Sequence, residues 1–202
     1  MSDTRPAGPP MGLRERKKAR TRAAIRTEAM RLFRERGYAA TTIEQIAAAA
    51  DISPATFFRY YPTKEDVVLQ DDLDVLLPEA VEAQPPSLGP IAAVRAAVAQ
   101  ALGPMGPAEL DRLQETIALS ASVPEIRARA ADEFTRTIEV MAAPLARRAR
   151  RSPDDPAVRH VAGAVIGVIW AATMVPPFDG DPADLVDRID GALAHLEKGL
   201  PL

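Results

Sequence analysis

The chain has 202 residues, of which 47% are hydrophobic and 26% are charged, so it is long enough to hold two hydrophobic cores. It contains no cysteine, which excludes disulfides, thiol catalysis and thiolate metal sites. The net charge of −3 conceals an uneven distribution, because residues 1–64 carry 13 Lys and Arg against 6 Asp and Glu, whereas the remaining residues carry 12 against 22. The first part of the chain is therefore the basic module that could meet a polyanion.

Residues 1–13 predict a disordered tail, because they are rich in proline and glycine and poor in apolar side chains. They lack the continuous apolar run of a signal peptide, so we expect the protein to stay in the cytoplasm.

A basic arm leads from this tail into the first long helix. Its members are Arg14, Arg16, Lys17, Lys18, Arg20 and Arg22. Such an arm can neutralise DNA phosphates and release counterions, and we expect this of Arg16, Lys17 and Arg20. A merely solvated, charged helix is the alternative interpretation.

The first long helix is predicted from about Lys18 to Arg36 and ends at Gly37, a favourable residue after a helix C-terminus. Its apolar stripe consists of Ile25, Ala29, Leu32 and Phe33. The stripe should pack across the next two helices, so we expect this helix to be a scaffold.

Residues 41–64 predict two short helices, a tight turn between them and the start of a third helix. Thr42 can cap the first short helix, with Gln45 three residues later closing a capping box. The helix should end near Ala50. Its apolar stripe consists of Ile43, Ile46 and Ala47.

The turn and the second short helix follow directly. Asp51 is a short polar residue that tolerates the left-handed conformation of the turn. Ser53 can cap a helix that begins at Pro54 and runs to about Tyr60. A helix of roughly 10 Å is short enough to enter a major groove roughly 12 Å wide with its end. This pattern predicts a helix-turn-helix that reads DNA, although two capped helices of this kind also occur in ordinary bundles.

A third helix is predicted after Pro62, with Thr63 as its cap. Lys64 should be its first residue and should face outward, where a phosphate could lie.

Residues 18 to about 70 resemble the TetR family of bacterial one-component regulators. The resemblance depends on the stripe of the first helix with Gly37 and Tyr38, on the segment from Thr41 to Ala47, and on the segment from Ser53 to Glu65. Two residues depart from the family pattern: Asp51 stands where the family often has Gly, and Tyr61 where it often has Phe. Neither change threatens the fold.

The resemblance implies roles for individual residues of this module. Thr42 and Lys64 would bind phosphates. Base edges would be approached by Ser53, Pro54, Ala55 and Thr56. The backbone and groove wall would be contacted by Phe58, Arg59 and Tyr60. Phe58 is a further departure, because the family often has Tyr there and the lost hydroxyl removes a phosphate hydrogen bond. Phe57 and Tyr61 should face the core.

The rest of the chain predicts a second, entirely helical domain, because prolines punctuate it and no strand pattern occurs. We expect the DNA-binding domain over residues 14–63 and the helical domain over residues 64–202. The expected helices run from Lys64 to before Pro78, from Pro85 to about Leu102, from Ala108 to Ser120, from Pro124 to about Arg151 with Pro144 inside it, from Pro156 to about Val175, and from Pro182 to about Lys198.

Residues 161–175 carry no charge on any face. Fifteen residues fall short of the roughly 20 that span a bilayer, so we expect no membrane contact, and a helix apolar all round must be buried all round. We expect burial between the chain's own core and a second copy, in a two-fold homodimer; a purely intramolecular core is the alternative. The predicted interface consists of Gly163, Gly167, Ala171, Leu185, Ile189, Leu193 and Leu196.

The family resemblance also implies a small-molecule cavity among the central helices. Candidate lining residues are aromatic or flexible side chains, namely Phe134, Ile138, Met141, Trp170, Met174 and Phe178. The expected effector is a small lipophilic compound, with acyl-CoA-like molecules as one class. For each of these residues, plain core packing is the alternative.

Together these features predict an all-α protein with an N-terminal three-helix helix-turn-helix DNA-binding domain and a C-terminal helical ligand-binding and dimerisation domain. Its expected function is that of a repressor, released from a pseudo-palindromic double-stranded DNA operator by its ligand. An enzyme is a rival class, but His160 and His195 have no metal-ligand spacing, and no phosphate-binding loop or nucleophile motif occurs; we therefore expect no cofactor. A ligand-independent architectural DNA-binding protein is the second rival.

Overall fold

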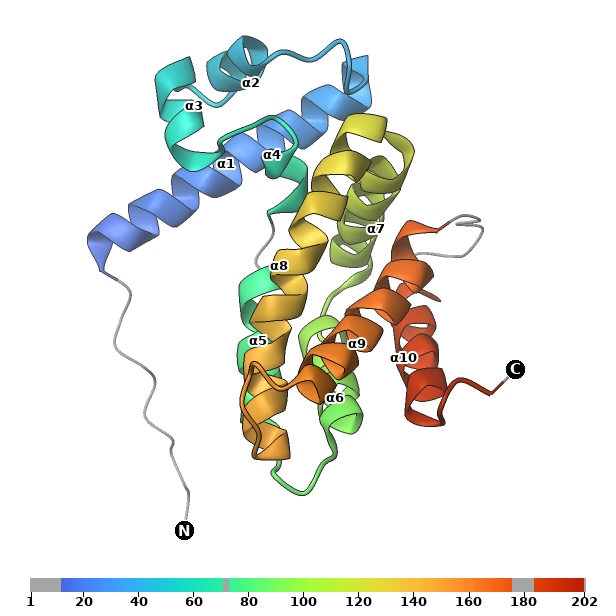
Figure 1. Ribbon diagram of the computed structural model, residues 1–202. Coiled ribbons are helices and arrows are strands. Elements are labelled where there is room, and N and C mark those ends of the chain that lie inside the picture. Colours follow the sequence, from blue (N-terminus) through green and yellow to red (C-terminus); the bar gives the residue numbers. More distant parts are fainter. Residues whose placement is uncertain (1–11, 71–72, 176–183, 202) are drawn as a thin grey trace. The chain divides into compact units, whose positions relative to one another are not determined.

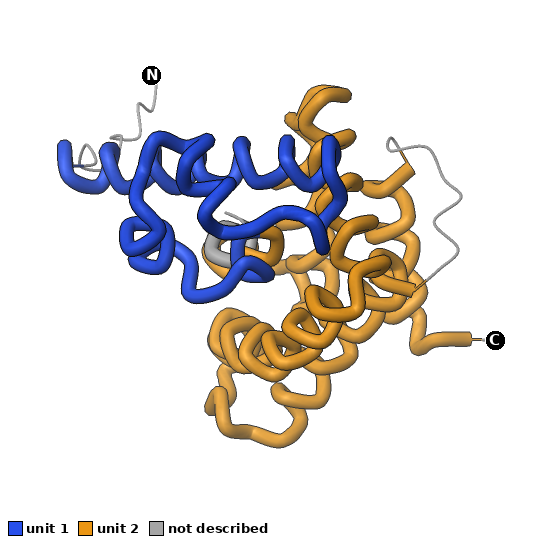
Figure 2. The backbone as a smooth tube through the Cα atoms, turned by 90° about the horizontal axis from the view of Figure 1, so that it is seen from above, with its two compact units in different colours: residues 1–67 blue, residues 68–202 orange. Residues whose placement is uncertain are grey.

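The computed structural model describes residues 12–70, 73–175 and 184–201, and every regular element in these ranges is a helix (Figure 1). The prediction of an all-α fold is therefore confirmed. The helices are α1 (Leu13–Arg36), α2 (Ile43–Ala49), α3 (Pro54–Tyr60), α4 (Asp66–Leu69), α5 (Leu73–Ala83), α6 (Pro90–Leu102), α7 (Pro107–Ser122), α8 (Pro124–Ala149), α9 (Pro156–Met174) and α10 (Asp184–Glu197). The chain forms two compact units, residues 1–67 and residues 68–202 (Figure 2).

The first unit is built on the buried stripe of α1, as predicted. Ile25 and Ala29 are fully buried, and the same core receives side chains from α2 and from the end of α3, namely Ile46, Ala47, Phe57 and Tyr61. The helix begins at Leu13 and not at Lys18, because Arg, Lys and Ala favour a helix and because Glu15 accepts a hydrogen bond from the backbone of Gly12. The basic arm is thus part of α1.

The caps of the helix-turn-helix are those the sequence predicts. The backbone of Gln45 donates to the Thr42 hydroxyl, and the Gln45 side chain accepts from the backbone of Thr42. Ser53 caps α3 in the same way through the backbone of Thr56. Asp51 holds the turn at a φ of 54°, in the left-handed region that most side chains avoid.

The segment after α3 departs from the predicted single helix that ends before Pro78. Thr63 and Asp66 cap each other at the start of α4, which ends at Leu69, and α5 contains Pro78 in its interior. A proline at this position removes one backbone hydrogen bond from α5 but does not end it. The next helix begins at Pro90 and not at Pro85, because Pro90 occupies the first helical position after Gly89.

The second unit has one hydrophobic core, formed mainly by α6, α8, α9 and α10. Its largest fully buried side chains include Met141, Leu145, Leu185 and Leu193. Pro144 lies inside α8, as predicted, and α8 ends where Arg150 adopts the left-handed conformation. Arg95 of α6 fastens α10 through a bidentate pair with Asp190 and a second ion pair with Glu197, all at 2.8–2.9 Å.

By length and composition alone α9 could cross a membrane, although the core helix of a globular protein passes the same test. In this structure α9 packs against α7, α8 and α10. Burial is confined to one side of the helix, at Val158, Ala162, Val165, Ile166 and Thr173. One chain alone therefore does not bury this helix all round, which speaks against the alternative of a purely intramolecular core; burial of the other side by a second copy stays a prediction.

Candidate nucleic-acid interface

Helix α3 has one buried side and one exposed side. Phe57 is fully buried and Tyr61 is almost so, which confirms both as core residues. The opposite side carries the residues predicted to meet DNA: Ser53, Pro54, Ala55, Phe58 and Arg59 are exposed, and Thr56 and Tyr60 are half-buried. The helix therefore presents a continuous outer surface of hydroxyl, apolar and cationic groups, which suits major-groove edges and phosphates.

Two hydroxyls at the start of α3 lie within hydrogen-bonding distance of each other. Ser53 Oγ and Thr56 Oγ1 are 3.0 Å apart, and Ser53 Oγ also accepts from the backbone of Thr56 at 3.1 Å. These contacts fix both side chains on the exposed end of the helix. Thr42, at the N-terminus of α2, is exposed as well, so its cap position can still receive a phosphate.

The end of α3 is fastened to α1 through two tyrosines. The Tyr61 hydroxyl donates to the carbonyl of Arg22 at 3.3 Å, and the Arg22 guanidinium lies 4.9 Å from the centre of the Tyr61 ring. The Arg59 guanidinium lies 5.4 Å from the Tyr60 ring. Hydrogen bonding with Thr21 and the positive charges of Arg59 and Lys18 lower the pKa of the Tyr60 phenol. Sequence periodicity alone gave no sign of this junction, because Thr21 and Tyr60 are 39 residues apart.

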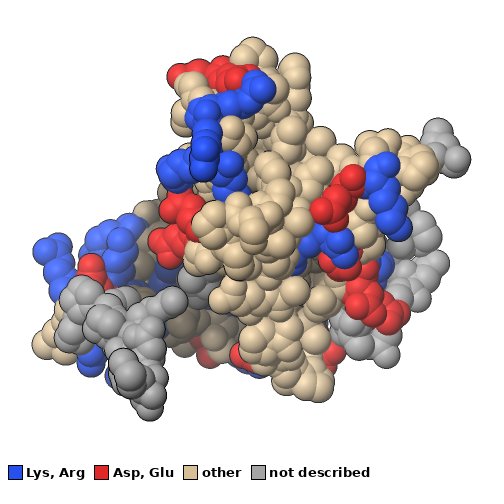
Figure 3. All heavy atoms as spheres, turned by 90° about the horizontal axis from the view of Figure 1, so that it is seen from below, with Lys and Arg blue, Asp and Glu red and all other residues tan. Residues whose placement is uncertain are grey.

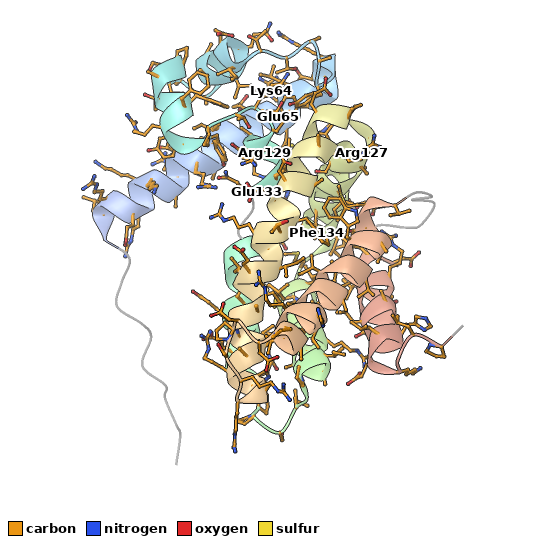
Figure 4. All side chains as sticks on the ribbon, viewed as in Figure 1. Lys64, Glu65, Arg127, Arg129, Glu133 and Phe134 are labelled. Carbon is orange, nitrogen blue, oxygen red and sulfur yellow. The ribbon has the colours of Figure 1, made fainter. Side chains whose placement is uncertain are left out.

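The structure contradicts the expectation that Lys64 faces outward. Its ammonium donates to the carbonyls of Tyr38 and Thr41, both at 3.0 Å, and lies 3.9 Å from the centre of the Tyr38 ring. The Tyr38 hydroxyl in turn donates to Glu65, the residue that follows Lys64; Figure 4 labels Lys64 and Glu65. Backbone carbonyls that end the α1–α2 connection attract the ammonium inward, so Lys64 braces the helix-turn-helix from inside.

Glu65 completes this brace. Burial raises the pKa of its carboxyl group, but hydrogen bonds from Tyr38, its own backbone and Thr63, together with the charge of Lys64, outweigh burial and lower it. The carboxylate is thus favoured in the folded protein. The sequence contains this group as adjacent Lys and Glu residues, but only the fold brings Tyr38 to them.

Of the predicted ligand-pocket residues, two make direct ring contact. Phe134 of α8, which Figure 4 labels, and Trp170 of α9 meet edge to face, with ring centroids 5.3 Å apart. Ile138 packs against the core, and Met141 is 2% exposed. Met174 is half-buried, and Phe178 lies outside the described residues.

Three buried hydroxyls in the same unit were not predicted as a group. Thr116, Ser120 and Thr173 each donate to the carbonyl four residues earlier, at 2.8–2.9 Å. Because each hydroxyl has a hydrogen-bond acceptor within its own helix, its burial costs little free energy. No sequence pattern marks these hydroxyls as buried.

The predicted dimer residues divide into two groups. Leu185, Ile189 and Leu193 are buried in the core of their own chain, so their assignment to the interface is wrong: α10 needs this stripe to pack on α6 and α9. Leu196 packs against that core but is only half-buried, so its assignment stays a prediction. Gly163 faces Ile138 of α8, 3.9 Å from where its Cβ would lie, which makes it an internal contact as well.

The remaining two predicted residues face away from the core. Nothing lies within 4 Å of a Cβ built on Gly167, and Ala171 is exposed. Together with Ala164, Val168 and Val175 they form one uncharged side of the helix, which we call the outer strip of α9.

Known proteins resemble this chain over both units. Residues 25–70 match the family of bacterial regulatory proteins called tetR, and residues 88–201 match the MftR C-terminal domain. The HTH-type transcriptional regulator TcmR of Streptomyces glaucescens is 41% identical over 108 residues, which are 52% of this chain and 47% of that protein. The chain therefore spans about half the length of this curated relative.

A solved structure is similar over nearly the whole chain. It is the Thermus thermophilus FadR, a TetR-family transcriptional repressor in complex with lauroyl-CoA, with 28% identity and a TM-score of 0.55 over 90% of this chain and 95% of that one. These matches include more than half of the sequence and both compact units. The chain accordingly belongs to the TetR family: it is a transcriptional regulator with an N-terminal helix-turn-helix DNA-binding domain, and not an enzyme.

Proposed function

We propose that this regulator is a homodimeric repressor that binds a pseudo-palindromic operator and leaves it when a small lipophilic ligand binds the second unit. The observation that supports it best is the outer side of α3, which carries Ser53 to Thr56, Arg59 and Tyr60. A helix of this size fits into the major groove of DNA. Such a protein acts on DNA in the cytoplasm.

On each protomer, base edges are read by the N-terminal half of α3 and phosphates by its end. Ser53, Pro54, Ala55 and Thr56 approach the bases, whereas Phe58, Arg59 and Tyr60 contact the backbone and groove wall. Thr42 and the basic arm of α1 supply further phosphate contacts. Lys64 is not among them, because its ammonium is held inside the first unit.

The outer strip of α9 supports the dimer. Small side chains at Gly167 and Ala171 permit close approach of a second helix, and Val175 is 54% exposed, although large apolar residues favour burial. On α10, Gly191 likewise has open space where a Cβ would lie. If these surfaces pack around a two-fold axis, the dimer has two copies of α3, and each can enter one of two successive major grooves.

The ligand site is proposed around the Phe134–Trp170 ring pair, with Ile138, Met141 and Met174 beside it. Its surroundings are apolar, which suits a lipophilic effector. The FadR neighbour binds lauroyl-CoA, so acyl-CoA-like compounds are the first class to test.

The test is a pair of titrations on the full chain. Operator DNA is first selected from random duplexes, and its affinity is then measured with and without lauroyl-CoA, while Trp170 emission reports ligand binding. An effector should lower operator affinity by a factor of about 5 to 150, and operator should lower ligand affinity by the same factor. Phe134→Ala should weaken ligand binding, whereas Val140→Ala, on the exposed side of the same helix, should not.

Two results would contradict the proposal. Selection that enriches no sequence would exclude a sequence-specific repressor. Operator binding that no lipophilic compound alters, across a panel of acyl-CoA and aromatic compounds, would favour the ligand-independent architectural protein.

A further inference from the structure

The apolar stripe of α1 continues toward the N-terminus as a basic row. At about 100° per residue, Lys18 lies about 20° from Ile25 around the helix axis, and Arg14 and Arg22 lie on the same stripe within about 60°. Arg14 and Lys18 are exposed and Arg22 is half-buried. The first turns of α1 extend past α3 (Figure 1), so the direction that points into the core at Ile25 points into solvent at Lys18.

This row lies on the side of α1 that faces the end of α3. Arg22 contacts the Tyr61 ring and its carbonyl accepts from the Tyr61 hydroxyl. Thr21, the residue before Arg22, hydrogen-bonds with the Tyr60 hydroxyl, and the positive charge of Lys18, one turn before Arg22, helps to lower the pKa of that phenol. Lys18, Arg59 and Tyr60 thus contribute an ammonium, a guanidinium and a phenol at the end of α3. Three donors, two of which are positively charged, suit the oxygens of one phosphate.

The other arm residues point elsewhere. Arg16 lies about 180° from Ile25 and Arg20 about 140°, on the far side of the helix, and both are exposed. Lys and Arg side chains lie where α1 begins and also form other groups on this face (Figure 3). The side of α1 that carries Arg22 is the one that contacts Tyr61 at the end of α3. Equal charge therefore does not mean equal distance from DNA that α3 engages.

We propose that Lys18, Arg59 and Tyr60 form a binding site for one DNA backbone phosphate, and that the row of Arg14, Lys18 and Arg22, and not Arg16 and Arg20, is the DNA-facing side of α1. The inference rests on the proposed function, because it assumes that α3 engages DNA. It adds Lys18 to the contact residues and divides the arm into a binding side and a solvated side. The partner is double-stranded DNA through its backbone, so the contact is independent of base sequence.

The experiment compares two substitutions on the same helix. Lys18→Gln and Arg16→Gln each remove one positive charge and keep a residue with good helix propensity. The full chain is titrated against a duplex without operator sequence over a range of NaCl concentrations. Lys18→Gln should weaken binding about fivefold to tenfold and reduce the slope of log affinity against log salt by about 0.9 for each phosphate that the variant no longer neutralises. Arg16→Gln should leave the slope unchanged.

A double-variant cycle tests whether Lys18 and Tyr60 share the phosphate. Tyr60→Phe keeps the ring beneath Arg59 and removes the hydroxyl. If both groups bind one phosphate, Lys18→Gln with Tyr60→Phe should weaken binding by less than the product of the two single factors. Multiplicative factors would place the two groups on separate phosphates and overturn the shared site.

The outcomes separate this inference from the proposed function. Equal slopes for Lys18→Gln and Arg16→Gln, or a larger change for Arg16→Gln, would overturn it while leaving DNA binding in place. A wild-type chain that binds no duplex even at low salt would instead overturn the proposed function.

Discussion

Replacing Lys64 with Met should destabilise the first unit without removing a phosphate contact. The substitution keeps the aliphatic stem and deletes the ammonium that donates to the carbonyls of Tyr38 and Thr41 at 3.0 Å. It also deletes the cation 3.9 Å from the Tyr38 ring and leaves Glu65 without its neighbouring positive charge. The two carbonyls then depend on water.

The size of the effect follows from these contacts. A hydrogen bond from a charged donor contributes about 1.5–3 kcal/mol, and a cation–ring contact about 0.5–1 kcal/mol near solvent. Lys64 is only half-buried, so water recovers part of the loss. We expect the free energy of unfolding of the first unit to fall by about 2–3 kcal/mol.

The chain contains its own probes for measuring this loss. All three tyrosines, Tyr38, Tyr60 and Tyr61, belong to the first unit, and the single tryptophan, Trp170, belongs to the second. In urea, the tyrosine transition of Lys64→Met should move to lower concentration while the tryptophan transition stays in place. Lys17→Met, which removes an exposed ammonium from the same unit, is the matched control and should move neither.

DNA binding distinguishes the brace from a phosphate contact. A phosphate-binding Lys64 would reduce the salt slope by about 1 when replaced, whereas a brace lowers affinity only as far as it loosens the unit and leaves the slope unchanged. An unchanged tyrosine transition together with a flatter salt slope would refute the structural interpretation of Lys64.

Three further predictions concern the turn, the second core and the dimer. Asp51→Ala should lower the stability of the first unit by about 1 kcal/mol, because Ala tolerates the left-handed φ poorly, whereas Asp51→Asn should leave the tyrosine transition unchanged. Arg95→Met should lower the free energy of unfolding of the second unit, followed by tryptophan emission, by about 0.5–1 kcal/mol at neutral pH. Since Arg95 lowers the pKa of Asp190, this stabilisation is present above the usual carboxyl pKa and is lost as pH falls through the lowered value. The stability of the variant should therefore lack this pH dependence. Gly167→Glu should reduce the mass in light scattering from twice 21.7 kDa to 21.7 kDa without shifting circular dichroism, because the glycine faces open space within its own chain; an unchanged dimer would remove α9 from the interface.

The helix-turn-helix could be predicted closely because its determinants are local. The hydroxyl of Thr42 meets a backbone only three residues away, and so does that of Ser53. Pro54 adds a fixed φ at the first helical position. These contacts need no tertiary structure, and α3 has the bounds that the sequence predicts.

The sequence predicted the effect of a proline correctly where the proline begins a helix, but not where it lies inside one. Pro124 and Pro156 begin helices, as predicted, and Pro107 begins the helix that was expected from Ala108. Pro78 was expected to end a helix and instead lies within one. A proline inside a helix costs one hydrogen bond and some strain, and whether packing of the flanking turns offsets that cost is a tertiary property.

Side-chain direction was the main quantity that the sequence could not supply. The ammonium of Lys64 can donate hydrogen bonds to a phosphate or to backbone carbonyls. Only the fold brings the carbonyls of Tyr38 and Thr41 close to it. The same applies to the aromatic residues of the second unit. Phe134 and Trp170 have the spacing of a packed core and of a ligand site alike, since both require apolar side chains on facing helices.

The two C-terminal helices show why amphipathicity identifies a buried stripe but not what buries it. Helix α10 has polar residues opposite Leu185, Ile189 and Leu193, so it has one stripe to bury, and its own core takes that stripe. Helix α9 carries apolar residues on every side, yet its own chain covers only one side. A helix with two apolar sides, of which its own chain covers only one, has apolar surface left to bury, whereas a helix with one covered stripe has none. The candidate for a second copy is therefore the helix whose apolar surface exceeds what its own chain covers, and in this protein that surface is the outer strip of α9.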